Sequence, residues 1–515
     1  MHILGILEEL TGAQGIGRTL RTLGALQPLQ ILARPPHLLL SRILHDVPSG
    51  HAPPTLASWP ETPAELRAFA EAEKTRSRRR LCKLPAGSLL RAYEEQYGLE
   101  LGAESSGPAC AWTGPCAVRP YPASVRARRI AVAIRCGRRD LSVELARAAR
   151  AVLTQLELHL LGNHLLENAL GLACAGAAAR GAEADLWWGA GRRLLDWQLP
   201  EQFLPDGGHF ERSATYHLAL CAGLCETIEL AGAAGRRVPS VWLQTARRAL
   251  GWAQAVRAPD GTYPLFNDAS LDAGPAVDDV LALARGCGLQ PAEIAATGTA
   301  AGGLRTLPDT GWLICSSPSA WLCLDAGPDG APYQGGHVHA DALTFELWIE
   351  GERAVVDYGV SSYGRDAARA ETRGTRVHNT VTVAGENSSE VWSAFRVGRR
   401  GQARILATTP TPNGVAVECE HDGYAWLAGR PVHRRQLVFT ARALSIDDLV
   451  ASATPHPAES RLRLAANARL RCEGDTVTSS DDCWHPEFAT PRPARVLTQP
   501  VPPDPAASAH WLLRW

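Results

Sequence analysis

Lysine is almost absent from this chain, and an excess of charge of either sign is absent as well. These absences exclude several classes of function. Only Lys74 and Lys83 occur among 52 basic residues, and this skew, with the abundance of alanine, indicates a GC-rich genome rather than a function. The formal net charge is −1, so no overall field exists that would attract nucleic acid or a polyanion. Binding of an acidic partner must therefore depend on local clusters of arginine.

Paired cysteines and long apolar runs are also missing. The 13 cysteines are scattered and none forms a Cys-x-x-Cys pair, which argues against a zinc ribbon or a thioredoxin-like site and suits a reducing compartment. No apolar run reaches transmembrane length, and residues 1–20 lack the basic and apolar regions of a signal peptide. As written, the sequence predicts a cytoplasmic protein that binds no membrane and no nucleic acid. An altered N-terminus would leave a periplasmic or secreted location open.

The length predicts several domains, because 515 residues are too many for one core. Residues 1–60 contain short apolar patches and paired prolines, which predict short helices and loops. Residues 61–304 show apolar side chains at helical spacing, broken by glycine and proline, which suits an incomplete (α/α) toroid. We expect helices over 141–153, 163–174, 184–197, 213–230 and 241–256.

Strand-like sequence replaces the helical pattern near residue 304. Candidate strands over 311–315 and 320–324 are followed by a hairpin over 343–356 and by further strands. A run of strands after a run of helices predicts a separate C-terminal antiparallel β-sandwich over 305–515. The proline-rich stretch 491–505 is expected to be a surface loop.

The segment 337–341 reads His-Val-His-Ala-Asp and is the richest in chemical groups. Histidines two apart on a strand point to opposite faces, so they can serve two purposes. His339 can join Asp357 and His378 as ligands of a divalent metal, for which zinc is the expected ion. Asp341 points to the same face as His339 and is the alternative to Asp357. His337 then faces a substrate.

A second cluster lies upstream, in the helical region. Asn163 and His164 begin an expected helix, whose free N–H groups and positive partial charge suit a carboxylate, although Asn163 can also be a simple N-cap. Segment 206–217 reads Asp-Gly-Gly-His-Phe-Glu-Arg-Ser-Ala-Thr-Tyr-His. Within it, Arg212 lies one turn before Tyr216 and is expected to lower the pKa of the phenol. Otherwise Tyr216 is a half-buried helix residue.

In this order the motifs resemble the heparinase II/III superfamily of polysaccharide lyases, from about residue 140 to about residue 450. The resemblance implies a helical toroid, a β-sandwich, one structural zinc and β-elimination on an anionic polysaccharide that contains uronic acid. It implies that Asn163 and His164 neutralise the uronate carboxylate, with a role for His164 as base on one C5 epimer as the alternative. Tyr216 would be the catalytic acid and possible base, and His337 a second base or carboxylate contact.

Residues close to these motifs are expected to touch or orient the substrate, and two other functions stay open. A glycoside hydrolase on a helical toroid needs two facing carboxylates, for which Asp206, Glu211 and Asp268 are available. A glycan-binding protein without turnover would keep the fold and the zinc. The expected substrate-binding residues are Arg212, Glu167, His217, Arg376 and Asn379.

Overall fold

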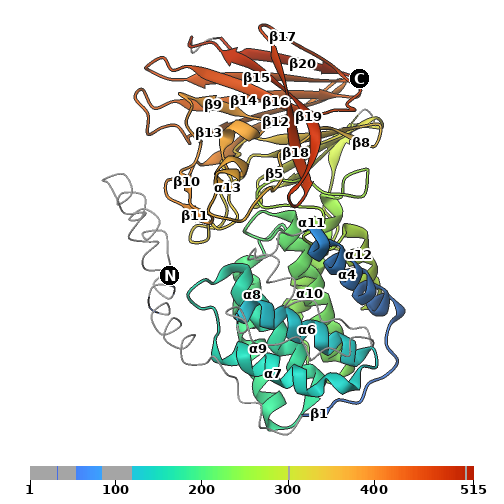
Figure 1. Cartoon of the computed structure of the whole chain (residues 1–515). Helices are drawn as coiled ribbons and strands as arrows, with labels where there is room; N and C mark the ends of the chain where they lie inside the picture. Colours follow the sequence, from blue (N-terminus) through green and yellow to red (C-terminus); the bar gives the residue numbers. More distant parts are fainter. Residues whose placement is uncertain (1–29, 31, 33–53, 84–118, 300–301, 505–506) are drawn as a thin grey trace.

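The chain folds into a helical half and a sheet-rich half that lie end to end (Figure 1). The computed structural model describes residues 30, 32, 54–83, 119–299, 302–504 and 507–515. The last helix of the helical half ends at Gly286, and the first strand of the large sheet begins at Thr297, before the predicted boundary at 304. The predicted helical toroid followed by an antiparallel β-sandwich is confirmed. Most of the predicted segment 1–60 lies outside the described residues.

Helix α8 (Gly162–Ala178) is the centre of the helical half. Its alanine-, leucine- and glycine-rich sequence leaves every residue buried except His164, which keeps a partly exposed side chain. The helix packs against α6, α9 and α10. The surrounding helices are α4 (Ala64–Lys83), α6 (Pro120–Arg135), α7 (Ser142–Thr154), α9 (Ala182–Gln202), α10 (Ala214–Ala233), α11 (Ser240–Ala255) and α12 (Val277–Gly286), with a 3-10 turn at Arg139–Leu141 and a short pair of strands, β1 (Thr55–Leu56) and β2 (Ala179–Arg180).

Two antiparallel sheets make up the other half. A six-stranded sheet has the order β12-β13-β14-β15-β20-β17, and a larger sheet runs β18-β19-β16-β8-β7-β6-β5-β4-β3, with β9 beside β16. The strands are β3 (Thr297–Thr299), β4 (Gly302–Leu307), β5 (Trp312–Ser316), β6 (Ala320–Asp325), β7 (Phe345–Ile349), β8 (Glu352–Val355), β9 (Val381–Val383), β12 (Ala403–Thr411), β13 (Gly414–His421), β14 (Val432–Thr440), β15 (Ala443–Ala451), β16 (Ala458–Ala465), β17 (Arg471–Gly474), β18 (Thr478–Glu487), β19 (Thr490–Val501) and β20 (Ala509–Arg514).

The large sheet is a middle layer, and its strands β5, β6 and β7 are buried on both faces. In β5, Leu313 packs into the core shared with the six-stranded sheet, whereas Trp312 and Ile314 pack into the core of the helical half. Strand β6 divides in the same way, with Leu322 in one core and Trp321 in the other. Alternating side chains on a strand point to opposite faces, so one strand can belong to both cores.

The predicted loop over 491–505 is wrong for most of its length. Strand β19 runs through it and pairs with β16 on one side and β18 on the other. Its alternating Ala494 and Val496 are buried, and this apolar pattern outweighs the prolines, which proteins normally confine to strand edges.

Hydrogen bonds join the helical half to the sheet-rich half at several points. Asp206 accepts the backbone N–H groups of Asp309 and Thr310, and the Trp348 indole donates to Asp260. Within the described ranges, no helix is both long and apolar enough to cross a membrane.

We expect Gly176→Ala to destabilise the helical half. A Cβ at Gly176 would lie 2.4 Å from the backbone nitrogen of Trp188 in α9, so the two helices would have to separate, and overpacking of this kind costs about 1–3 kcal/mol. The matched control is Gly232→Ala in α10, where nothing lies within 4 Å of the added carbon. Thermal unfolding should show a lower Tm for Gly176→Ala only; equal melting of both variants would contradict this packing.

Candidate active site

The His337 side chain is held between two residues of the helical half, Asp268 and Asn163, each of which contacts one of its ring nitrogens. Its Nδ1 lies 2.9 Å from Asp268 Oδ2, and its Nε2 lies 3.0 Å from Asn163 Nδ2. An ionised carboxylate can only accept, so Nδ1 carries the hydrogen and donates it to Asp268. The Nε2 lone pair then faces Asn163.

The orientation of the Asn163 amide is fixed by a second carboxylate. Glu211 accepts from Asn163 Nδ2 at 2.7 Å and from the Asn163 backbone N–H at 3.0 Å. Burial works to raise the pKa of Glu211, but His337, His209 and the bonds from Asn163 lower it overall. Because Glu211 is anionic, the amide NH2 and not the amide oxygen must face both Glu211 and His337. The bonds to Asp268 and to Glu211 therefore lead to the same conclusion, that His337 Nε2 is a hydrogen-bond acceptor.

Tyr216 stacks on His337 and supplies a neutral phenol. The ring centres are 3.8 Å apart with an angle of 28°, and Tyr216 Oη lies 3.1 Å from Tyr363 Oη. Burial, with Tyr363 and Asp268 nearby, raises the pKa of Tyr216 well above its usual range. A phenol with a raised pKa keeps its proton at neutral pH and can donate it.

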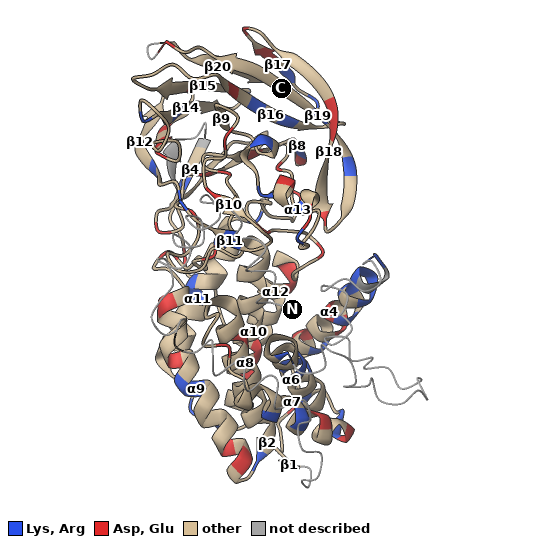
Figure 2. Ribbon diagram, turned by 60° about the vertical axis from the view of Figure 1, so that its left-hand side comes forward, with Lys and Arg blue, Asp and Glu red and all other residues tan. Residues whose placement is uncertain are grey.

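The expected effect of Arg212 on Tyr216 is wrong. Arg212 has a left-handed φ of 53° before α10 begins, and its guanidinium donates to the backbone oxygens of Phe210, Asp309, Thr310 and Gly330. The cation that does act to lower the pKa of Tyr216 is Arg80, which lies in the basic C-terminal part of α4, blue in Figure 2.

His164 lies at the start of α8 and is paired with a buried acid. Its Nδ1 is 3.0 Å from Glu157 Oε1, and its ring centre is 4.5 Å from that of Tyr121. Burial opposes the charged form, but Glu157 outweighs it and raises the pKa of His164. A partly exposed imidazole with a raised pKa is a suitable contact for an anion.

Asp268 joins the site to a group of potential metal ligands. Besides His337, it accepts from His339 Nε2 at 2.9 Å and from both terminal nitrogens of Arg369. Burial alone would raise the pKa of Asp268, but Arg369 and the two histidines hold it well below its usual range. One buried anion thus positions histidines that point in different directions.

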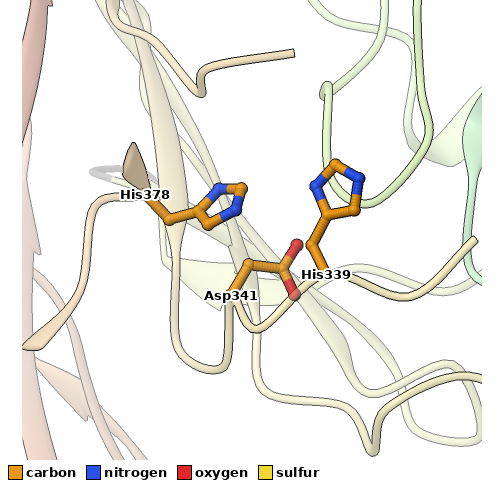
Figure 3. Close-up of side chains that lie close together, drawn as sticks. All are labelled: His339, Asp341 and His378. Atoms are coloured by element: carbon orange, nitrogen blue, oxygen red, sulfur yellow. The ribbon is translucent and has the colours of Figure 1, made fainter. Parts of the chain in front are cut away.

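The ligand group consists of His339, Asp341 and His378, whose ligand atoms lie within 4.8 Å of one another (Figure 3). His339 Nδ1 and His378 Nε2 are buried, and neither has a hydrogen-bond partner among the described residues. Their other ring nitrogens bind Asp268 and Asp357 respectively. This arrangement fits a metal, because ligand histidines usually donate their second N–H to a carboxylate.

Asp341 takes the place predicted for Asp357. Both carboxylate oxygens of Asp357 lie 3.0 Å from His378 Nδ1, and one also accepts from Thr344 at 3.0 Å. Asp357 therefore orients His378, whereas the alternative, Asp341, completes the group. Spacing along the chain does not distinguish a ligand from the acid that orients it, and Asp357 as third ligand stays a prediction.

Most residues predicted to bind substrate are engaged in the interior. Glu167 pairs with Arg128, and His217 Nε2 lies 3.0 Å from the Ala249 backbone oxygen. Asn379 donates to two backbone oxygens and is fully buried, as Arg212 nearly is. Only Arg376 of this set is exposed.

Sequence reasoning missed the supporting acids and a second tyrosine. The sequence offers Asp268 and Glu211 as hydrolase carboxylates, and Asp268 also as part of a turn or of a cleft floor, whereas no motif points to Glu157 or Tyr363. Glu211 has a usable signal, because it lies five residues before Tyr216 in the motif that carries the resemblance. These acids do not form a pair of carboxylates that could face one sugar bond, because each is hydrogen-bonded to a histidine or to Asn163.

The architecture defines the class, a helical toroid joined to a β-sandwich, and the sequence comparisons define the family. Residues 143–282 match the heparinase II/III N-terminus and residues 299–485 match the heparinase II/III-like C-terminal region. The chain belongs to the heparinase II/III superfamily, as the resemblance predicted.

Curated relatives and solved structures agree with this assignment. A heparin-sulfate lyase of Bacteroides stercoris is 28% identical over 56% of this chain and 44% of its own, and one of Bacteroides thetaiotaomicron is 23% identical over 48% and 40%. The matched part is thus less than half the length of these relatives. A heparinase III crystal structure shares the fold, with TM-score 0.59, 16% identity and coverage of 91% of this chain and 79% of that one. The structure of a heparan sulfate lyase from Pedobacter heparinus matches with a TM-score of 0.54 and 17% identity, and the match covers 87% of this chain and 75% of that one.

We expect Asp268→Asn to lower both stability and activity. The change leaves the buried Arg369 without its anion, and breaking a buried ion pair costs about 3–5 kcal/mol. Asp278→Asn is the control, because Asp278 also accepts two bonds from one arginine but lies at the surface, where such pairs contribute about 0–1 kcal/mol. Denaturant unfolding that gave similar values for the two variants would remove Asp268 from its central position.

Proposed function

We propose that this protein is a polysaccharide lyase that cleaves a uronic-acid-containing polysaccharide by β-elimination. The new end would carry a 4,5-unsaturated uronate. The observation that carries the proposal is the fixed direction of the bonds around His337, which leaves an unprotonated Nε2 beside a neutral, stacked Tyr216. The names of the heparin-sulfate lyases support a glycosaminoglycan-like substrate, with an alginate-like polymer as the alternative.

The carboxylate of the uronate must be bound first. The proton at C5 is weakly acidic, and its removal needs donors that stabilise charge on the carboxylate as it grows. Asn163 offers the N–H that faces His337, and His164 offers an imidazolium favoured by Glu157. Glu211 holds the amide so that this N–H points outward from the helix start.

Two proton transfers complete the reaction. His337 Nε2 takes the proton from C5, and Asp268 stabilises the resulting imidazolium. Tyr216 gives its phenolic proton to O4 as the C4–O4 bond breaks and the C4–C5 double bond forms. The proton on His337 then returns to Tyr216, so no water is consumed.

We also propose one zinc ion per chain, bound by His339 Nδ1, Asp341 and His378 Nε2. A histidine and carboxylate set of this kind suits zinc. The support is the pair of buried, partnerless nitrogens that face the carboxylate. A zinc ion there would cross-link the segment that carries His337 to the loop before β9 and would serve stability rather than proton transfer.

Incubation with heparan sulfate, chondroitin, hyaluronan and alginate should give products that absorb in the near ultraviolet on at least one polymer. Tyr216→Phe should lower that rate about a hundred- to ten-thousand-fold, because it removes the acid but keeps the ring. Tyr424→Phe is the control, since it deletes a buried hydroxyl that donates to Val381 in the sandwich. Saturated products from every active polymer would establish hydrolysis instead, and a Tyr216→Phe rate within threefold of wild type would place the acid elsewhere.

Elemental analysis should find one zinc per chain, and chelation should lower the Tm because metal binding adds to folding stability. His378→Ala and Asp341→Asn should lose the metal. Asp357→Asn should weaken zinc affinity by about ten- to a hundredfold, as loss of an outer hydrogen bond does. His456→Ala is the control, because this partly exposed histidine binds the Ala428 backbone oxygen and lies outside the ligand group. Full zinc content in Asp341→Asn would assign the third ligand to Asp357.

A further inference from the structure

An aromatic ring is exposed at the tip of the hairpin formed by β10 (Val391–Trp392) and β11 (Arg396–Val397). Phe395 is 39% exposed, although its neighbour Ala394 is buried. Single exposed apolar residues are common on protein surfaces and need no function. Phe395 differs from such residues in its position and in the hydrogen bonds that hold its hairpin.

Two buried arginines of one short segment hold the hairpin tip. Arg369, in α13 (Ala367–Thr372), donates from Nε to the Ala394 backbone oxygen at 2.8 Å. Arg373 donates to the backbone oxygens of Trp392 and Ser393, each at 3.4 Å, and to that of Val338 at 2.8 Å. The tip is therefore tied to the loop between β6 and β7 that carries His337.

The ring lies beside the proposed base, His337, and beside Tyr363, which contacts the proposed acid. The Phe395 ring centre is 6.5 Å from that of His337 at 79°, and 5.8 Å from that of Tyr363. Tyr363 in turn meets the hydroxyl of Tyr216. Arg369, which fixes the tip, is the same residue that binds Asp268, so hairpin and catalytic histidine share one anchor.

We propose that Phe395 is a substrate-binding residue whose exposed face stacks on a sugar ring next to the bond that is cleaved. Sugar rings have apolar C–H faces that pack on aromatic rings, and polar substrates are usually held by a few such surfaces among oriented polar groups. The neighbouring Arg396, whose guanidinium lies 4.8 Å from the Trp392 ring centre, brings positive charge to the same tip. An apolar face beside a cation fits an anionic saccharide. The proposal rests on the proposed function.

The test is steady-state kinetics on the polymer that wild type cleaves best. Phe395→Ala should raise KM roughly three- to tenfold, as expected if the exposed part of the ring is buried by substrate, and should leave kcat within about twofold. Phe395→Tyr should restore the wild-type KM because it keeps the aromatic face. Phe395→Leu should resemble alanine, since it fills space without a flat ring.

Trp197→Ala is the matched control, because Trp197 is 40% exposed on α9 in the helical half. It should leave both constants unchanged. A KM for Phe395→Ala equal to that of wild type would overturn the proposal, and so would a loss confined to kcat, which would mean that the ring only positions His337. Equal Tm values for Phe395→Ala and wild type establish that the fold is intact.

Affinity electrophoresis separates this proposal from the proposed function. If wild type yields no unsaturated product, the lyase assignment fails, and gels that contain the same polysaccharides then decide the role of Phe395. Stacking on a saccharide would be supported if the polysaccharide slowed the migration of wild type and of Trp197→Ala but did not slow that of Phe395→Ala. Equal migration of all three proteins would refute it.

Discussion

The rest of the site depends on one buried carboxylate, that of Asp268. It comes from the helical half, yet its partners His337, His339 and Arg369 all belong to the sheet-rich half. A buried anion is costly unless it is paired and fully hydrogen-bonded, so these contacts fix how the two halves meet. The same loop adds Asn267, whose side-chain oxygen accepts the His339 backbone N–H at 3.0 Å.

Hydrogen-bond direction at the site follows from groups that can only accept. Asp268 fixes which nitrogen of His337 carries hydrogen, and Glu211 fixes which end of the Asn163 amide faces His337. Between these two anions, one N–H and one lone pair are left facing each other. In the proposed reaction, an arriving carboxylate takes the N–H and thereby releases the lone pair, which ties substrate binding to the availability of the proposed base.

Rigidity comes from the middle layer. Strands β5, β6 and β7 are packed between helices and a second sheet, and the segment with His337, His339 and Asp341 connects β6 to β7. Both of its ends are therefore anchored in strands that are buried on two faces. Arg369 of α13 and Arg373, which directly follows that helix, hold the other side of this connection and also the hairpin with Phe395. The proposed catalytic and substrate-stacking groups are therefore built on one support.

The sequence by itself determined the order of helices and strands and the residue types at the site. Periodicity located α7 to α11 within a few residues, because apolar spacing reflects which face is buried. The expectation that His337 and His339 point to opposite faces of a strand is wrong, because the segment is a loop between β6 and β7 and both imidazoles contact Asp268. Asn163, Tyr216 and His337 do lie together, and their catalytic roles stay predictions.

Only the tertiary structure decided which distant groups meet. Arg80 rather than Arg212 acts on Tyr216, Asp341 rather than Asp357 completes the ligand group, and β19 forms despite its prolines. Each of these outcomes depends on contacts between segments far apart in the chain. Sequence spacing constrains neighbours within a turn or a strand, whereas the pairing of a buried charge is set by whichever segment the packed cores bring next to it.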